Sequence, residues 1–408
     1  MDLSDRENDM ANVPLRIAVV TETYPPEING VAMTISRMVE GLRQRHVVEL
    51  VRPRQHPQDA ARCEPGLQEL LTRGLPIPRY PELRLGLPAK HQLFTRWQAR
   101  RPDVVHLVTE GPLGWSALKA ARQLGIPVSS DFHTNFHSYS RYYGFGWLYK
   151  AVAGYLRKLH NRANTTLVPT QELRNTLEQD GYRNLQVVAR GVDTRLFHPI
   201  KRSAALREQW GVADNGLAVI YVGRISPEKN LPLVLRAFEA MQLHNPALKL
   251  VLVGDGPLRA ELQQQYPQHI FAGMQTGEAL AAHYASGDIF LFASMTETYG
   301  NVTVEAMASG LAVVAYRYAA AAEHIVHDEN GLYAEFGNEE KFIQLACNLA
   351  NDAARVNRLR TQSHLSMLQL DWQNIVDEFE RALAQLALPK EVRHATTKLQ
   401  PATNSNLG

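Results

Sequence analysis

The chain has 408 residues, of which 45% are apolar and 21% charged, and its net charge is +2 at pH 7. This is the composition of an ordinary globular protein, and the length predicts two domains of roughly 100–200 residues each. The only cysteines, Cys63 and Cys347, exclude a disulfide framework and favour a reducing compartment.

No apolar run reaches the roughly 18 to 20 residues that span a bilayer. The start of the chain, 1–12, is polar and acidic and lacks the pattern of a secretory signal. The end, 392–408, is polar and predicts a disordered tail. We therefore expect a cytoplasmic protein.

The charge is unevenly distributed. Residues 1–195 hold 26 Lys and Arg against 19 Asp and Glu, whereas residues 196–408 hold 17 against 22. The basic excess is concentrated in 73–162, with 14 basic and 4 acidic residues. A one-sided basic surface attracts anionic partners such as lipid headgroups or nucleic acid. A solvated face without a partner fits the same pattern.

In chain order, short apolar runs alternate with helical patterns through the first half. Strands are predicted at 16–21, 47–51, 104–108, 127–130 and 166–169. Helices are predicted at 31–43 and 113–124, and an amphipathic helix with a basic side at 145–163. Continuous apolar runs interleaved with helices predict a parallel sheet covered on both faces.

The same alternation restarts near residue 217. The predicted elements are strands at 217–222, 249–253, 270–272, 289–292 and 312–315, with helices at 231–243, 278–286 and 302–309. The fold class is thus α/β with two Rossmann-like domains, 14–197 and 198–370, facing each other across a cleft. The last helix, 374–388, is amphipathic. It either caps the second domain or crosses back to the first.

Ligands of open parallel sheets bind at the carboxyl ends of the strands, so the loops there are the candidate site. The loop GRISPEKN follows the strand at 217–222 and contains Arg224 and Lys229. A guanidinium fork and an ammonium five residues apart suit a diphosphate. A surface loop with two ordinary basic residues is the alternative. The turn at 254–257 (GDGP) is interpreted as structural.

The loop ETYGNVTVE follows the strand at 289–292 and enters a helix. The amide groups of Gly300, Asn301 and Val302 would point out of the helix start, which predicts an anion site for a diphosphate. Glu297 and Glu305 flank this start. Carboxylates only accept hydrogen bonds, so both are predicted to bind hydroxyl groups. Alternatively, Glu305 only complements the helix dipole.

In the first half, Gly30 stands at a helix start, where its missing Cβ allows close approach to a phosphate. His133 follows the strand at 127–130, in a loop rich in polar and aromatic residues, and is either an active-site group or a structural histidine. GxGxxG and GxxxxGK[ST] motifs are absent, which disfavours a hydride-transfer cofactor and P-loop ATP hydrolysis. Metal-ligand spacing and a DxD triplet are also absent, so no catalytic metal is expected.

Together these segments resemble the retaining nucleotide-sugar glycosyltransferases of family 4, which have the two-Rossmann GT-B fold. The similarity runs from about residue 16 to 388 and is strongest in ETYGNVTVEAMASG and GRISPEKN. In the first half, ETYPPEINGVA, TEGPLGWSA and DFHTNFHSYSRYYG resemble the branch with bacterial α-mannosyltransferases and glycolipid glycosyltransferases. Tyr299 stands where the family usually has phenylalanine, and Asn29 where the family often has glycine. The first departure is expected to be harmless, and the second bears only on the detail of the loop before Gly30.

The resemblance implies a role for each matched residue in the second half. Arg224 and Lys229 would hold the donor diphosphate. Glu297 would bind hydroxyl groups of the donor sugar, and Glu305 would bind the ribose. In the first half, Gly30 would touch the β-phosphate, and His133 would lie beside the reacting carbon of the sugar.

The implied activity is metal-independent hexose transfer with retention, from GDP-mannose or, as an alternative, from a UDP-hexose. The acceptor, a lipid or a glycan, would bind the first domain. The basic excess and the helix at 145–163 favour a lipid-linked acceptor and a peripheral position on the inner face of an anionic cytoplasmic membrane, with no nucleic acid partner. A nucleotide-sugar epimerase and a non-catalytic binding module of the same fold are the rival interpretations.

Overall fold

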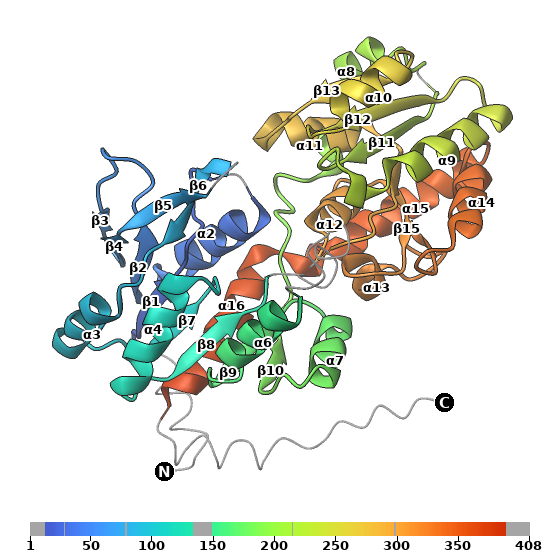
Figure 1. Cartoon of the computed structure of the whole chain (residues 1–408). Coiled ribbons are helices and arrows are strands. Elements are labelled where there is room, and N and C mark those ends of the chain that lie inside the picture. The colour runs from blue at the N-terminus through green and yellow to red at the C-terminus, as the bar shows by residue number, and fades with distance from the viewer. Residues whose placement is uncertain are drawn as a thin grey trace, which may run out of the picture.

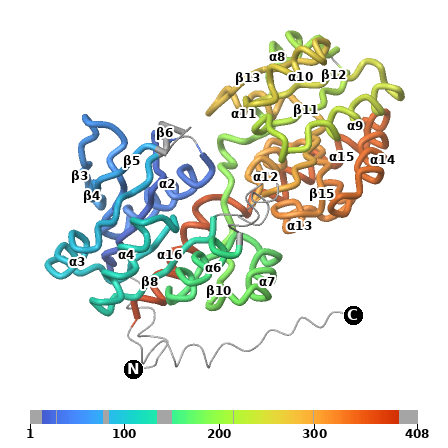
Figure 2. The backbone as a smooth tube through the Cα atoms, viewed as in Figure 1, coloured from blue at the N-terminus to red at the C-terminus, as the bar shows by residue number. Residues whose placement is uncertain are grey.

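The computed structural model of the chain describes residues 13–388, apart from 28, 78–79, 134–148, 214 and 298. Two α/β lobes stand side by side and are joined by extended linkers (Figure 1; Figure 2). The predicted fold class, two Rossmann-like domains, is confirmed. The predicted tail at 392–408, most of the loop after His133 and the first residues of the predicted helix at 145–163 lie outside the described residues.

Within the described ranges, the first lobe is built on an eight-stranded sheet of order β10-β9-β8-β7-β1-β2-β4-β3. β3 runs antiparallel to β4, and the other neighbours pair in parallel. The strands are β1 (Arg16–Val20), β2 (Val47–Pro53), β3 (Cys63–Glu64), β4 (Leu67–Thr72), β7 (Val104–Leu107), β8 (Val128–Asp131), β9 (Thr165–Val168) and β10 (Leu185–Val187). A separate antiparallel hairpin joins β5 (Gly74–Ile77) and β6 (Tyr80–Gly86). The helices are α2 (Gly30–Leu42), α3 (Lys90–Ala99), α4 (Pro112–Gln123), α6 (Tyr149–His160) and α7 (Gln171–Gln179).

The second lobe has, in the part of the chain that the structure describes, a six-stranded parallel sheet of order β13-β12-β11-β14-β15-β16. Its strands are β11 (Ala218–Val222), β12 (Lys249–Val253), β13 (Ile270–Gly273), β14 (Ile289–Phe292), β15 (Ala312–Tyr316) and β16 (Leu332–Ala334). Its α-helices are α8 (Ala204–Gln209), α9 (Leu231–His244), α10 (Arg259–Gln265), α11 (Gly277–Ser286), α12 (Asn301–Ala308), α13 (Ala320–His324), α14 (Glu339–Leu349) and α15 (Ala353–Met367). Short 3-10 helices occur at η1 (Pro199–Lys201), η2 (Pro227–Lys229) and η3 (Leu368–Leu370).

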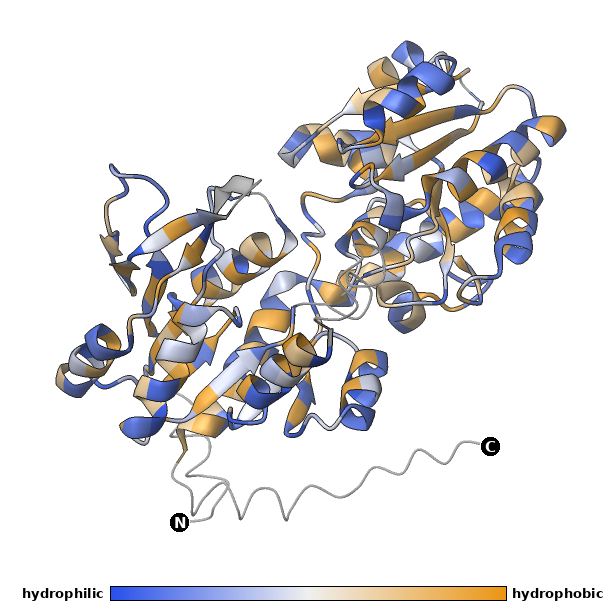
Figure 3. Cartoon of the chain, viewed as in Figure 1, coloured by the Kyte–Doolittle hydropathy of each residue, from blue (hydrophilic) through white to orange (hydrophobic). Residues whose placement is uncertain are grey.

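The predicted strands correspond to β1, β2, β7, β8, β9 and β11–β15, with ends displaced by at most a few residues. The central strands β1, β7, β11, β14 and β15 are almost entirely buried, because helices cover both faces of each sheet. Figure 3 shows the result as apolar strands inside each lobe and polar helix faces outside.

The last helix, α16 (Trp372–Ala387), follows the second lobe in sequence but packs on the first (Figure 1). Val376, Phe379 and Leu383 are buried in the cluster that contains Ile17 and Ile35. The helix therefore completes the core of the first lobe, as one of the two sequence interpretations held.

Two chain segments that connect the lobes lie against each other. The backbone N–H of Val192 donates to the carbonyl of Leu370 at 2.9 Å, and Thr194 Oγ1 donates to the Asp371 carboxylate at 3.1 Å. A Cβ on Gly191 would lie 2.8 Å from the Trp372 ring, so only glycine allows this approach. The lobes are consequently held by a paired connection.

Among the described residues, no helix combines the length and the apolar character needed to cross a membrane.

Phe379→Ala should lower the free energy of unfolding of the first lobe. The ring is 1% exposed and meets the His106 ring edge-on at a centroid distance of 4.8 Å. Removing a buried aromatic side chain costs about 3–5 kcal/mol, which calorimetry would detect as a lowered unfolding temperature. Leu243→Ala, at a position 86% exposed, is the control and should leave that temperature unchanged. Equal effects of the two changes would contradict the packing of α16.

Candidate active site

The carboxyl ends of β11 and β14 form the centre of the candidate site. β11 lies between β12 and β14 in the sheet. From β11 the chain continues to β12 and β13 on one side, and it then crosses to β14 on the other side of β11. Such a switch point opens a crevice between the loops that follow the two strands. The loop after β11 carries Arg224 and Lys229, and the loop after β14 carries Glu297.

The structure brings Lys229 and Glu297 together although 68 positions separate them. The ammonium of Lys229 forms an ion pair with the Glu297 carboxylate and lies 5.8 Å from the centroid of the Phe292 ring. The backbone N–H of Met295 donates to the carbonyl of Glu228 at 3.0 Å, which ties the two loops together. The pair places one cation and one carboxylate at the same edge of the sheet.

Arg224 is more open. Its side chain is 45% exposed, and Nη1 lies 4.0 Å from the buried carboxylate of Glu228. The hydroxyl of Tyr221 donates to the Arg224 carbonyl at 2.9 Å and fixes the backbone. A guanidinium on a fixed backbone with an exposed end can reach an anion in the crevice.

The turn at 254–257 supports this loop. Gly254 has φ of +137°, and a Cβ there would lie 1.9 Å from the Gly223 carbonyl oxygen. The backbone N–H of Ile225 donates to the carbonyl of Asp255 at 2.9 Å. The structure thus agrees with the interpretation of the turn as a structural element.

Helix α12 begins at Asn301 with its start facing the site. Gly300 precedes it with φ of +90°, a left-handed conformation that favours glycine, and no side chain caps the helix. The amide groups of Gly300, Asn301 and Val302 belong to the turn that lacks intrahelical acceptors. The helix start therefore carries the partial positive charge predicted for an anion site.

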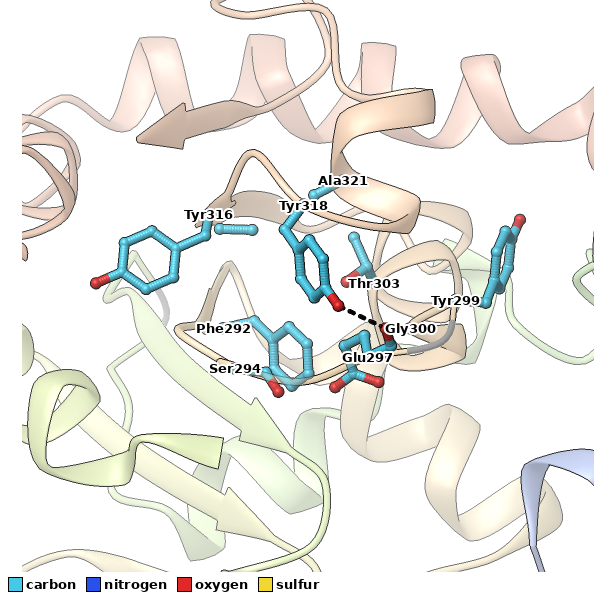
Figure 4. A pocket seen from close by; sticks show the side chains of 10 residues that line it. Phe292, Ser294, Glu297, Tyr299, Gly300, Thr303, Tyr316, Tyr318 and Ala321 are labelled. Carbon is cyan, nitrogen blue, oxygen red and sulfur yellow. Dashed lines mark hydrogen bonds between the residues drawn. The ribbon is translucent and has the colours of Figure 1, made fainter. Parts of the chain in front are cut away.

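A small pocket opens beside this helix start (Figure 4). The side chains of Glu297 and Ser294 lie on one side, and the ring of Tyr318 lies opposite, with its hydroxyl donating to the Glu297 carbonyl at 2.9 Å. Tyr299 points away from these side chains. The pocket is lined by Phe292, Ser294, Glu297, Gly300, Thr303 and Tyr318, among others.

Glu305 lies beyond the first turn of α12, which contains no acidic residue. Its carboxylate accepts a hydrogen bond from the Tyr284 hydroxyl at 2.9 Å. Burial raises the pKa of Glu305 to about 7, although the bond from Tyr284 acts in the opposite direction. A position past the first turn is unfavourable for a residue whose only role is to complement the helix dipole.

Gly30 opens helix α2 directly opposite the start of α12. Asn29 caps α2, with its Oδ1 accepting from the N–H groups of Val31 and Ala32 at 3.1 and 2.8 Å. A Cβ on Gly30 would lie 3.4 Å from Nδ2 of Asn301. Two helix starts, one from each lobe, therefore meet at the boundary between the lobes.

His133 follows β8 and has both ring nitrogens engaged. Nε2 lies 3.0 Å from the Asp131 carboxylate, and Nδ1 lies 2.7 Å from a guanidinium nitrogen of Arg190. Burial opposes the charge of Asp131, but His106 and His133 outweigh this effect and hold the pKa of Asp131 well below its usual value.

These partners were not predicted. Asp131 could have been found, because residues i and i+2 at a strand end share a side of the sheet. No motif in the sequence marks Arg190.

Comparison with known proteins defines the family. The sequence profile of glycosyl transferases group 1 matches residues 216–352, and that of glycosyltransferase family 4 matches residues 28–196. A GDP-mannose-dependent α-mannosyltransferase of Mycobacterium tuberculosis is 32% identical over 368 residues, which cover 89% of this chain and 95% of the relative. The chain belongs to glycosyltransferase family 4. It is therefore a glycosyltransferase that uses a nucleotide-sugar donor.

Two further relatives extend this result. The α-monoglucosyldiacylglycerol synthase of Streptococcus pneumoniae is 29% identical over 317 residues, covering 74% of this chain and 71% of the relative. Among solved structures, Anabaena HepE in complex with UDP and glucose superposes with a TM-score of 0.68 at 20% identity, covering 91% of this chain and 99% of the other. The latter likeness supports the GT-B fold of the family 4 enzyme.

Glu305→Gln should stabilise the protein at alkaline pH. Because the folded-state pKa of Glu305 is raised from 4.5 to about 7, folding takes up a proton between these values, and stability falls as pH rises through this window. The amide removes that penalty, so the gain should be on the order of 3 kcal/mol at pH 8 and close to zero at pH 4.5. Thermal unfolding at both pH values measures it, with the exposed Glu329→Gln as control. A gain that does not depend on pH would contradict the raised pKa.

Proposed function

We propose that this glycosyltransferase moves mannose from GDP-mannose to a lipid-linked acceptor, with retention at the anomeric carbon and without a metal ion. The observation that carries the proposal is the Lys229–Glu297 pair at the strand ends beside the start of α12. The name of the mycobacterial relative, a GDP-mannose-dependent α-mannosyltransferase, supports the donor.

Breaking the bond between the anomeric carbon and the diphosphate oxygen leaves negative charge on the diphosphate. Arg224, Lys229 and the amide groups at the start of α12 are the groups that stabilise it. When the diphosphate takes over the Lys229 ammonium, the Glu297 carboxylate is released to accept hydrogen bonds from the sugar hydroxyls. Glu305 accepts from the ribose hydroxyls.

In the first lobe, the backbone at Gly30 contacts the β-phosphate, and His133 lies beside the reacting carbon. The acceptor hydroxyl attacks from the side that the diphosphate leaves, and a diphosphate oxygen takes its proton. The new bond then forms on the face where the old one stood, which is retention.

The acceptor surface is proposed on α4 and α6 of the first lobe. The Trp115 ring lies 5.5 Å from the Tyr155 ring, with Lys119 and Arg162 over its face at 5.8 and 5.5 Å. Tyr155 is 40% exposed. Aromatic rings beside exposed basic groups suit the boundary of an anionic bilayer. The diacylglycerol in the name of the pneumococcal relative supports a lipid acceptor. A lipid acceptor in turn fits a peripheral place on the inner face of the cytoplasmic membrane.

Transfer assays separate the proposed donor from its alternative. A UDP-hexose is the second candidate donor. GDP-mannose should raise the unfolding temperature and support transfer in the presence of EDTA, whereas UDP-glucose and ADP-glucose should not. Release of UDP instead of GDP would show that the donor is a UDP-hexose and not GDP-mannose. Loss of transfer in EDTA would refute metal independence. NMR of the product reads the anomeric configuration.

Lys229→Ala should lower kcat at least about a hundredfold, because the diphosphate loses a cation whose charge contact is worth a few kcal/mol in the transition state. Lys341→Ala, an exposed lysine on α14, is the matched control and should keep full activity. Activity of Lys229→Ala within threefold of the unaltered enzyme would refute the assignment.

The protein should float with liposomes that contain anionic lipid at low salt and should be released at high salt, because screening weakens exposed charge pairs. Charge reversal of Lys119 and Arg162 to Glu should abolish flotation, whereas reversal of the exposed Arg358 in the second lobe should not. Absence of binding at low salt would remove the membrane proposal.

A further inference from the structure

Arg190 is a buried cation in the segment that connects the two lobes. It is 7% exposed, and one guanidinium nitrogen lies 2.7 Å from Nδ1 of His133. Because a guanidinium only donates, Nδ1 accepts and the ring proton sits on Nε2, which faces the Asp131 carboxylate at 3.0 Å. Arg190 and Asp131 together fix both the tautomer and the orientation of the His133 ring.

The chain of contacts continues into the first lobe. Asp131 also faces Nε2 of His106 at 3.2 Å, and Nδ1 of His106 lies 2.8 Å from the hydroxyl of Ser129. His106 is fully buried on β7. The carboxylate that holds His133 is thus itself held by the sheet.

In the other direction, Tyr299 of the second lobe holds Arg190. Its hydroxyl donates to the Arg190 carbonyl at 2.9 Å, and the guanidinium lies 5.8 Å from the centroid of its ring. The same hydroxyl lies 2.9 Å from Nε2 of His324 on α13. Burial lowers the pKa of His324 to about 4, so its imidazole is neutral at pH 7 and can donate to the Tyr299 oxygen.

Tyr299 also belongs to the loop after β14 that carries Glu297, which we call the donor loop because it lies at the proposed sugar-donor site. It lies directly before Gly300 and the start of α12 and, like Glu297, is one of the residues that line the pocket, with its ring pointing away from Glu297 and Ser294 (Figure 4). Its ring is 1% exposed. Phenylalanine, which the family usually has here, could fill the same space but could not make either hydrogen bond. The hydroxyl is the part of the side chain that reaches the linker.

We propose that Arg190 is a positioning residue for sugar transfer, clamped by the Tyr299 hydroxyl, so that the donor loop of the second lobe sets the orientation of His133 in the first. The proposal rests on the proposed function, in which His133 lies beside the reacting carbon. It adds that the two halves of the site are aligned through the linker. A ring held 1 Å or 20° out of place is enough to lower turnover.

The test compares three variants of the full chain in the transfer assay. Arg190→Met keeps the length of the side chain but removes the guanidinium that donates a hydrogen bond to His133. Its kcat should fall about 10- to 100-fold, with KM for the nucleotide-sugar within about threefold. Arg190→Lys, which keeps a cationic donor, should recover at least part of that loss. Tyr299→Phe should lower kcat about fivefold with unchanged KM. Tyr333→Phe, on the edge strand β16, is the control and should be unaffected.

Two measurements exclude a merely structural effect. Affinity for GDP by calorimetry should stay within about twofold of the unaltered protein, since Arg224 and Lys229 remain. With ¹⁵N-labelled histidine, the Nδ1 signal of His133, assigned from its loss in His133→Asn, should shift in Arg190→Met and in Tyr299→Phe but not in Tyr333→Phe.

An unshifted His133 signal in Arg190→Met, equal losses for Met and Lys at position 190, or a loss confined to KM would overturn the proposal. If Lys229→Ala loses transfer activity while Arg190→Met keeps full activity, only the proposed role of Arg190 is refuted. If Lys229→Ala and Arg190→Met are both fully active, the proposed function fails with it.

Discussion

The ion pair between Lys229 and Glu297 is the contact on which the rest of the site depends. It joins the loops after β11 and β14, two strands that are neighbours only because the sheet reverses direction at β11. An ammonium and a carboxylate that neutralise each other remain compatible with a partly buried crevice, whereas either alone would carry a desolvation penalty. A diphosphate with sugar hydroxyls offers each of them a replacement partner. In the absence of a ligand the two groups therefore pair with each other, and a nucleotide-sugar would separate them by offering the ammonium a diphosphate and the carboxylate hydroxyl groups.

Around this pair, the lobes are arranged so that positive ends of helices converge. The starts of α2 and α12 meet at Gly30 and Asn301, where a Cβ on Gly30 would be in ordinary van der Waals contact with the Asn301 side chain. The turn at Gly254 fixes the loop of Arg224 from behind. Rigid loops on strand ends keep such groups aligned before a ligand arrives, and this preorganisation lets them stabilise developing charge without rearrangement.

The connection between the lobes is itself part of the site. The linker is paired to the segment before α16 through Val192 and Leu370, and α16 completes the core of the first lobe. Arg190 lies in that linker, between His133 and Tyr299. The domain arrangement and the geometry beside the proposed reacting carbon therefore depend on the same short stretch of backbone. Linkers in two-domain proteins are usually polar and exposed, whereas in this one Val188, Arg190, Gly191, Val192 and Phe197 are buried.

The sequence by itself determined the two α/β units, the central strands and the candidate loops, because buried parallel strands are continuous apolar runs and ligands gather at their carboxyl ends. It did not show the hairpin β5–β6, the edge strands β10 and β16 or helices α14 and α15, whose patterns are short or weak without their packing partners. Arg224, Lys229, Glu297 and Glu305 were named from local pattern and family resemblance. Only the tertiary structure paired Lys229 with Glu297, set Gly30 against Asn301 and placed Arg190 between His133 and Tyr299, because these contacts join residues dozens of positions or more apart. Sequence periodicity records which face of an element is buried, but not which distant element covers it.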